Sequence, residues 1–134
     1  MRDGLTRKLA VGERDADFTR FLAGVRASLV VLEGAVAGAE HEIERPCTSL
    51  GRGPGVDLAF ADPAMSKQHA CVEWADGSLR VRDLGSMNGV LVNGAPVQAA
   101  DLKHGDRFQL GEHVFQLVLE QRRREPRAYV LPDA

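Results

Sequence analysis

The stretch ACVEWADGSLRVRD, residues 70–83, decides the fold of this 134-residue chain. Apolar and polar residues alternate on both sides of Asp76-Gly77. Alternation with a period of two is typical of a strand with one buried face, and Asp-Gly favours a two-residue turn whose central residues both need positive φ. The stretch therefore predicts a β-hairpin with strands at 70–75 and 78–83.

Short strand-like segments continue in both directions from this hairpin. Clusters of Gly, Pro, Asn and Asp separate them, as at Gly53-Pro54-Gly55. Many short strands without alternating helices predict an all-β sandwich or barrel and exclude a parallel α/β sheet. The remaining predicted strands are 27–33, 41–45, 48–51, 57–60, 90–93, 107–111 and 113–119.

Composition limits the class of protein. The chain is 44% hydrophobic and 27% charged, as expected for one globular domain. Apolar runs stay far below the ~20 residues that span a bilayer, and the N-terminus has no apolar signal segment. We therefore expect a cytoplasmic protein without a membrane segment. Cys47 and Cys71 lack CxxC spacing, so we expect free thiols and no zinc site.

The N-terminal residues differ from the strand-rich region. Phe18, Phe21, Leu22 and Val25 recur at helical spacing, which predicts a short amphipathic helix over 15–23. Its start would be capped by Asp15 or Asp17, and residues 1–13 show no periodicity. The apolar face has two interpretations: it packs on the neighbouring domain, or it docks a partner.

Charge divides the chain into three parts. Residues 1–26 form an N-terminal extension with net charge +2, since six Lys/Arg oppose four Asp/Glu. Residues 27–120, the predicted β domain, have net charge −6 from seven against thirteen, and residues 121–134 form a basic tail at +2. An acidic domain argues against a general nucleic-acid surface. The run Arg122-Arg123-Arg124 is a solvated tail or contacts nucleic acid, an acidic partner or lipid headgroups.

Four residues at predicted strand ends share a chemistry suited to an anion. Arg52 offers a planar fork of donors, Ser66 a hydroxyl and Lys67 an ammonium group. The Asn88 amide both donates and accepts, which suits a peptide backbone. None of these residues is an activated nucleophile. The set therefore indicates phosphate binding rather than catalysis, and no metal or cofactor is implied.

Six short motifs follow one another along the predicted β domain. They are Gly51-Arg52, Ser66-x-x-His69, Asp83-Leu84-Gly85-Ser86-x-Asn88-Gly89, Val92-Asn93-Gly94, Leu102-x-x-Gly105-Asp106 and Leu110-Gly111. In the order of these motifs, the chain resembles the forkhead-associated (FHA) domain family. The resemblance covers residues 27–120, and it implies a two-sheet β-sandwich of about eleven strands that binds phosphothreonine peptides through loops at one end.

Carried over by position, the resemblance implies a role for each of the four residues. Arg52 and Ser66 would contact the phosphate, and Lys67 would add a third contact. Asn88 would hold the peptide backbone beside the phosphothreonine. The family also places the threonine methyl in a small apolar slot.

Five neighbouring positions complete the comparison. Gly51 and Gly89 would supply backbone freedom, and His69 would support the loop that presents Ser66. Two positions depart from the family pattern. Met87 stands where Thr, Lys or Arg is frequent, which removes a potential phosphate contact. Val90 stands where Thr is usual, which we expect to affect packing more than binding.

The sequence thus predicts a phosphothreonine-peptide-binding module in Ser/Thr kinase signalling, without catalysis. Its partner would be a phosphothreonine-containing protein, namely a Ser/Thr kinase or its substrate. Two alternatives stay open. Met87 favours a phosphorylation-independent interaction module, and the Arg-rich tail allows a nucleic-acid adaptor, against which the acidic domain counts.

Overall fold

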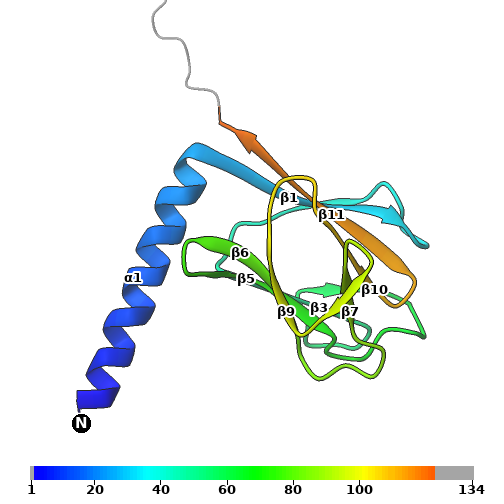
Figure 1. Cartoon of the computed structure of the whole chain (residues 1–134), viewed down its shortest axis with the longest axis horizontal. Helices are drawn as coiled ribbons and strands as arrows, with labels where there is room; N and C mark the ends of the chain where they lie inside the picture. The colour runs from blue at the N-terminus through cyan, green and yellow to red at the C-terminus, as the bar shows by residue number, and fades with distance from the viewer. Residues whose placement is uncertain (1, 123–134) are drawn as a thin grey trace, which may run out of the picture.

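The structure, a computed structural model, describes residues 2–122, which form one helix and eleven strands in two sheets (Figure 1). The helix α1 spans Arg2–Gly24. The first sheet has the order β2–β1–β11–β10–β7–β8, with β2 at Glu40–Glu42, β1 at Val25–Glu33, β11 at His113–Gln121, β10 at Arg107–Leu110, β7 at Val90–Val92 and β8 at Ala95–Val97. The second has the order β4–β3–β5–β6–β9, with β4 at Leu58–Ala59, β3 at Cys47–Gly51, β5 at Ala70–Ala75, β6 at Ser78–Asp83 and β9 at Ala99–Leu102. The predicted two-sheet β-sandwich is confirmed.

The predicted hairpin forms with the predicted boundaries. Strands β5 and β6 pair in antiparallel register from Ala75↔Ser78 outward. Asp76 and Gly77 between them have φ values of 51° and 80°. Two successive positive φ angles characterise the type I′ turn, whose twist matches that of the flanking strands. The local sequence alone therefore sets this register.

Apolar side chains from both sheets meet in the core between them. The rings of Phe108 and Phe115 stack with centroids 5.0 Å apart, and both are fully buried. Val72 and Val81 bury their side chains from the second sheet. Val90 lies in the same core cluster. This placement agrees with the expectation that valine there affects packing.

The helix begins at Arg2, so it is longer than the predicted range 15–23. Residues 2–14 are rich in Arg, Leu, Lys, Ala and Glu and lack proline, so they favour a helix without an apolar face. Because the helix starts earlier, Asp15 and Asp17 lie inside it. The prediction that either residue caps its start was wrong.

The last turns of α1 pack on one end of the sandwich, whereas its beginning projects away from both sheets (Figure 1). Phe18 is buried, and the ring of Phe21 lies 4.5 Å from that of Trp74. The Trp74 Nε1–H donates a 3.0 Å hydrogen bond to the Asp17 carboxylate. Of the two interpretations of the apolar face, packing on the neighbouring domain is the one observed.

Several strands differ from the predicted ranges at their ends, as β4 does at Leu58–Ala59 against 57–60, and three differ more. The predicted strand 41–45 is shorter and occupies Glu40–Glu42, because Pro46 limits pairing beyond it. Strands β8 and β9 were missed, since β8 contains Pro96 and is mostly exposed. A proline is tolerated there because β8 is an edge strand.

Two further sequence predictions concern the basic tail at 121–134 and the expected lack of a membrane segment. Of the predicted basic tail, the structure describes Gln121 at the end of β11 and Arg122, whose backbone N–H donates to Gly24 O at 2.9 Å. The other tail residues, 123–134, lie outside the described residues. No helix within residues 2–122 is long and apolar enough to cross a membrane.

Candidate functional site

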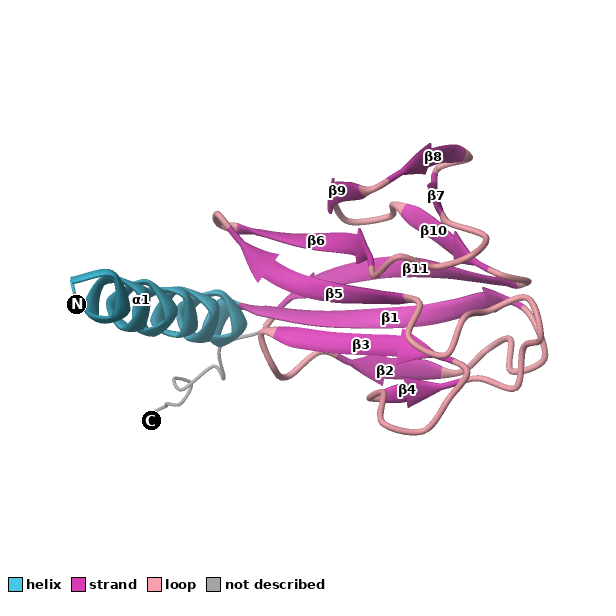
Figure 2. Cartoon of the chain, turned by 90° about the horizontal axis from the view of Figure 1, so that it is seen from below, coloured by secondary structure: helices cyan, strands magenta, loops and turns pink. Residues whose placement is uncertain are grey.

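Three loops meet at one pole of the sandwich: β3–β4, β4–β5 and β6–β7. Figure 2 shows them at the end opposite α1. The Arg52 N–H donates to Ser66 O at 3.0 Å, which joins the first two loops. The Met87 N–H donates to Ser66 Oγ at 3.0 Å, which joins the third. Ser66 therefore lies at the centre of the cluster.

Gly51 permits the close approach of the first two loops. A Cβ atom at Gly51 would lie 2.0 Å from the carbonyl oxygen of Lys67, a distance that no side chain tolerates. Its φ lies outside the left-handed region, so its role is close approach, and the expected backbone freedom does not explain it. Gly89, in contrast, has φ +79°, a conformation that favours glycine.

Arg52 extends its side chain into solvent from this junction. Its Nε–H donates to Met65 O at 3.0 Å, which fixes the plane of the guanidinium group. Within residues 2–122, its terminal nitrogens donate no hydrogen bond. The side chain is thus oriented, with its strongest donors available to an anion.

The hydroxyl group of Ser66 is likewise available to donate a hydrogen bond to an anion. Its Oγ accepts the Met87 N–H, so the hydroxyl proton is available for donation. Its own backbone N–H donates to Nδ1 of His69 at 3.0 Å. Ser66 and Arg52 can therefore donate to one anion from two bonded loops.

His69 joins two of the loops from below and is completely buried. Because a backbone N–H can only donate, Nδ1 must be the unprotonated nitrogen, and Nε2 carries the proton. That Nε2–H donates to Gly89 O at 2.7 Å. The ring thereby ties the backbone of Ser66 to that of Gly89.

Lys67 and Asn88 lie at the rim of the cluster, and both are exposed. The Asn88 Nδ2 donates to Ala64 O at 2.8 Å, which orients the amide and leaves its oxygen to face a ligand. Lys67 packs its stem near Gly53. Between these loops, Met87 is 89% exposed, so its apolar side chain has no packing role.

The sequence reasoning missed two supports of the β6–β7 loop, Asp83 at the end of β6 and Ser86 within the loop. The Ser86 N–H donates to Asp83 Oδ1 at 2.9 Å, and Ser86 Oγ accepts the Gly89 N–H at 2.9 Å. These bonds fold the loop into a compact turn. An Asp three residues before a Ser is the local signal that would have indicated them.

Asp62 is a second support that the sequence did not reveal. This carboxylate is only 2% exposed, and it accepts hydrogen bonds from His113 Nδ1 at 2.8 Å and from the Glu112 and Ala64 backbone N–H groups. Burial alone would raise the pKa of Asp62, but these three donors outweigh burial and lower it below its ordinary value. Asp62 thus anchors the β4–β5 loop to β11.

We expect Asp62→Asn to lower the free energy of unfolding by about 1–3 kcal/mol near pH 7, because buried donors lose an ionised acceptor. Because the pKa of the Asp62 carboxyl is lower in the folded than in the unfolded protein, the ionised group stabilises the fold at pH values above its unfolded pKa of about 3.9. This stabilisation is lost as the pH falls through the folded-state pKa. The difference between the two proteins should therefore narrow below about pH 4. Urea unfolding from pH 3 to 7 measures it, with the exposed Glu112→Gln as control; a constant difference would contradict this account.

No cluster suited to a metal ion accompanies this site. Among residues 2–122, no group of three or more His, Cys, Asp or Glu side chains lies close enough to hold one. The site is instead composed of N–H and O–H donors. Its chemistry is that of anion recognition.

Comparison with known proteins identifies the family. An FHA domain model matches residues 48–111. The crystal structure of the FHA domain of CT664 from Chlamydia trachomatis is 34% identical, with a TM-score of 0.65, over 69% of this chain and 96% of that one. This chain belongs to the FHA domain family. The family predicted from the sequence is therefore confirmed.

Two further FHA relatives bear on function. A structure described as an analysis of phosphothreonine-dependent FHA domain interactions is 27% identical, with a TM-score of 0.63, over 69% of this chain and 95% of that one. The glycogen accumulation regulator GarA of Mycolicibacterium smegmatis is 41% identical over 92 residues, which are 69% of this chain and 57% of GarA. The chain thus spans little more than half of GarA. Phosphothreonine-dependent interactions are thus described for an FHA domain similar to this chain.

Proposed function

We propose that this FHA domain binds phosphothreonine peptides at the pole formed by its three loops. Arg52 and Ser66 contact the phosphate, Lys67 adds a charge at the rim, and Asn88 holds the peptide backbone. One observation carries the proposal: the Arg52 N–H is hydrogen-bonded to Ser66 O at 3.0 Å, so both phosphate donors start from one rigid junction. Preorganised donors lose little entropy on binding.

The residues beneath the pole act as supports in this proposal. His69 and Gly89 hold the Ser66 and Asn88 loops together, and Gly51 allows the approach of Lys67. The Asp62 carboxylate is buried and accepts hydrogen bonds from His113 Nδ1 and from two backbone N–H groups. A phosphate at the surface therefore meets the exposed side chains of Arg52 and Lys67.

The partner is a phosphothreonine-containing protein, and we infer that it is a Ser/Thr kinase or a kinase substrate. The domain acts by binding and performs no catalysis. The regulatory name of GarA supports this, as does the chemistry of Arg52, Ser66 and Lys67, none of which is an activated nucleophile. A cytoplasmic location follows from the kinase setting. It agrees with the free thiols of Cys47 and Cys71.

A phosphorylation-independent interaction is the second candidate. It is favoured by Met87, which presents a large, exposed apolar side chain in the β6–β7 loop. Binding of a phosphothreonine peptide library and of its unphosphorylated counterpart to the full chain separates the two. Equal capture of both libraries would reject our proposal. The nucleic-acid alternative rests on the Arg-rich tail, in which Arg122 pairs with Glu42 at 3.4 Å. The rest of this tail, residues 123–134, lies outside the described part of the chain, and the alternative stays a prediction.

We expect matched phosphothreonine and phosphoserine peptides to differ about fourfold in affinity. One buried methyl group contributes about 0.8 kcal/mol, which corresponds to that ratio. Titration calorimetry with two peptides that differ only in this methyl measures it. A larger preference would require the methyl also to fix the phosphate rotamer, and equal affinities would mean that the apolar slot is missing.

A further inference from the structure

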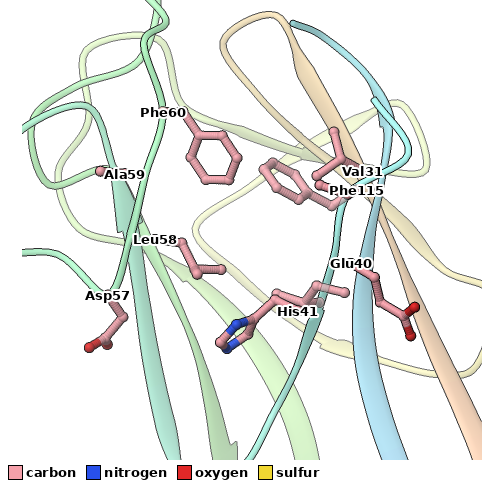
Figure 3. A pocket seen from close by; sticks show the side chains of 10 residues that line it. Val31, Glu40, His41, Asp57, Leu58, Ala59, Phe60 and Phe115 are labelled. Carbon is pink, nitrogen blue, oxygen red and sulfur yellow. The ribbon is translucent and has the colours of Figure 1, made fainter. Parts of the chain in front are cut away.

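An apolar groove opens between the two sheets at the edge formed by β2 and β4 (Figure 3). Leu58, Phe60 and Phe115 line it together with Leu29 and Val31. Its volume is about 270 Å³, whereas pockets for drug-sized ligands typically measure about 300–1,000 Å³. The groove therefore has room for a single large side chain. Leu58 and Phe60 are only half-buried, so an apolar occupant would cover surface that water now contacts.

The lining suits an aromatic ring that carries a polar tip. The rings of Phe60 and Phe115 lie 5.3 Å apart in an edge-to-face arrangement, a spacing at which aromatic rings pack favourably. His41 stands at the mouth of the groove (Figure 3), and within residues 2–122 its ring nitrogens have no hydrogen-bond partner. A tyrosine meets both conditions, because its ring is largely apolar and its hydroxyl group can donate to an imidazole.

The end of β11 leads toward this groove. The Arg122 N–H donates to Gly24 O at 2.9 Å, and the Arg122 guanidinium group pairs with Glu42 of β2 at 3.4 Å. Glu42 is the neighbour of His41 in β2. Tyr129, the only tyrosine of the chain, follows Arg122 by seven positions. The one tyrosine is therefore tethered to an arginine that is bonded beside the groove.

The segment between Arg122 and Tyr129 is long enough to reach the groove. Leu29, which lines the groove from β1, lies five positions beyond Gly24, or ~17 Å at about 3.3 Å per residue. Seven extended residues span at most ~25 Å. The difference leaves chain for the change of direction around the edge of β2.

Charge favours the same path. The strand β2 and the residues after it carry a carboxylate at every second position, Glu40, Glu42 and Glu44, on a free edge of the first sheet. The segment between Arg122 and Tyr129 carries three arginines and one glutamate, so its net charge is +2. Exposed ion pairs contribute little to stability. These charges therefore guide the segment along β2, and the buried ring supplies the affinity.

We propose that Tyr129 inserts its ring into the groove between β2 and β4 and donates a hydrogen bond to His41. Residues 123–128 then follow the edge of β2 and cover backbone groups that would otherwise be open to a strand of another chain. The tether raises the effective concentration of the ring at the groove, which can reach the millimolar range. This inference goes beyond the proposed function and does not depend on it, because neither Arg52 nor Ser66 takes part.

The test compares trypsin cleavage after Arg127 in the full chain with cleavage of a synthetic peptide of residues 121–134. Cleavage in the full chain should be roughly tenfold slower, because burial of most of one large apolar side chain shifts the docking equilibrium by about that factor. Ala59→Glu places a charge in the groove lining and should restore the rate of the peptide. The matched control Ala95→Glu adds the same charge to an exposed alanine of the edge strand β8 and should retain the protection.

Nuclear magnetic resonance of the chain labelled at tyrosine reports on a single ring, since Tyr129 is the only tyrosine. Its ring protons should show nuclear Overhauser contacts with the methyl groups of Leu58, a measurement that needs no variant. Tyrosine signals that coincide with those of the free peptide overturn the inference, as does protection that persists in Ala59→Glu. Protection that rises with protein concentration would assign the groove to the tail of a second copy, which also overturns it. His41→Asp, on the opposite wall, replaces Ala59→Glu if circular dichroism shows that the latter is unfolded.

Discussion

Replacing Arg52 by alanine is expected to weaken phosphothreonine-peptide binding by about ten- to a hundredfold. A charge-assisted hydrogen bond contributes on the order of 1.5–3 kcal/mol, which corresponds to this range. The side chain is exposed and makes one hydrogen bond within the domain, from Nε to Met65 O. The free energy of unfolding should therefore change little. Titration calorimetry and urea unfolding of the same preparations measure both quantities.

Two variants control for charge and for the shape of the guanidinium group. Arg52→Lys keeps the charge but loses the planar fork, so its affinity should fall between those of the wild type and Arg52→Ala. Arg20→Ala removes an equally exposed arginine from α1, at the opposite pole, and should leave affinity unchanged. Unchanged affinity of Arg52→Ala would remove this residue from the site.

The substitution His69→Ala should lower the free energy of unfolding by about 2–5 kcal/mol. The imidazole accepts the Ser66 N–H and donates to Gly89 O from a fully buried position. Its removal leaves two backbone groups without partners, each at about 1–3 kcal/mol, and a cavity beneath the loops. Because Ser66 loses its support, peptide affinity should also fall. Urea unfolding measures the first effect and calorimetry the second.

Gln68→Ala is the matched control, since Gln68 is the exposed neighbour of His69 in the same loop. Its stability should stay within about 0.5 kcal/mol of the wild type. If His69→Ala were as stable as Gln68→Ala, the two hydrogen bonds of the ring would contribute nothing. That result would reject the supporting role assigned to His69.

The sequence predicted those parts of the fold whose signals are local. The hairpin at 70–83 needs only an alternating pattern and the pair Asp76-Gly77, both readable within fourteen residues. The early start of α1 was missed because helix formers without an apolar stripe give no periodicity. Strand β8 was missed because an exposed three-residue edge strand with Pro96 has no inward face to show.

The residues of the candidate site also fall into two groups, those with a local signal in the sequence and those that depend on contacts between distant segments. Arg52, Ser66, Lys67 and Asn88 are predicted from their chemistry and their position in motifs, and the structure brings their loops together. Their supports depend on contacts between distant segments: Asp62 meets His113 across 51 positions, and Gly51 is required by the carbonyl of Lys67. Such pairings leave no pattern in either segment alone. The groove beside β4 is likewise visible only when both sheets are assembled.

The contact between α1 and Trp74 gives this protein an intrinsic fluorescent probe. Trp74 is the only tryptophan of the chain, and its indole lies in tilted contact with the rings of Phe18 and Phe21 and is hydrogen-bonded to Asp17. The fluorescence of Trp74 therefore monitors the packing of α1 on the sandwich. The proposed phosphopeptide site lies at the other end of the molecule (Figure 2). If a bound peptide changes the Trp74 fluorescence, a conformational change must pass through the whole sandwich. If the fluorescence stays the same, the two ends of the domain are not coupled.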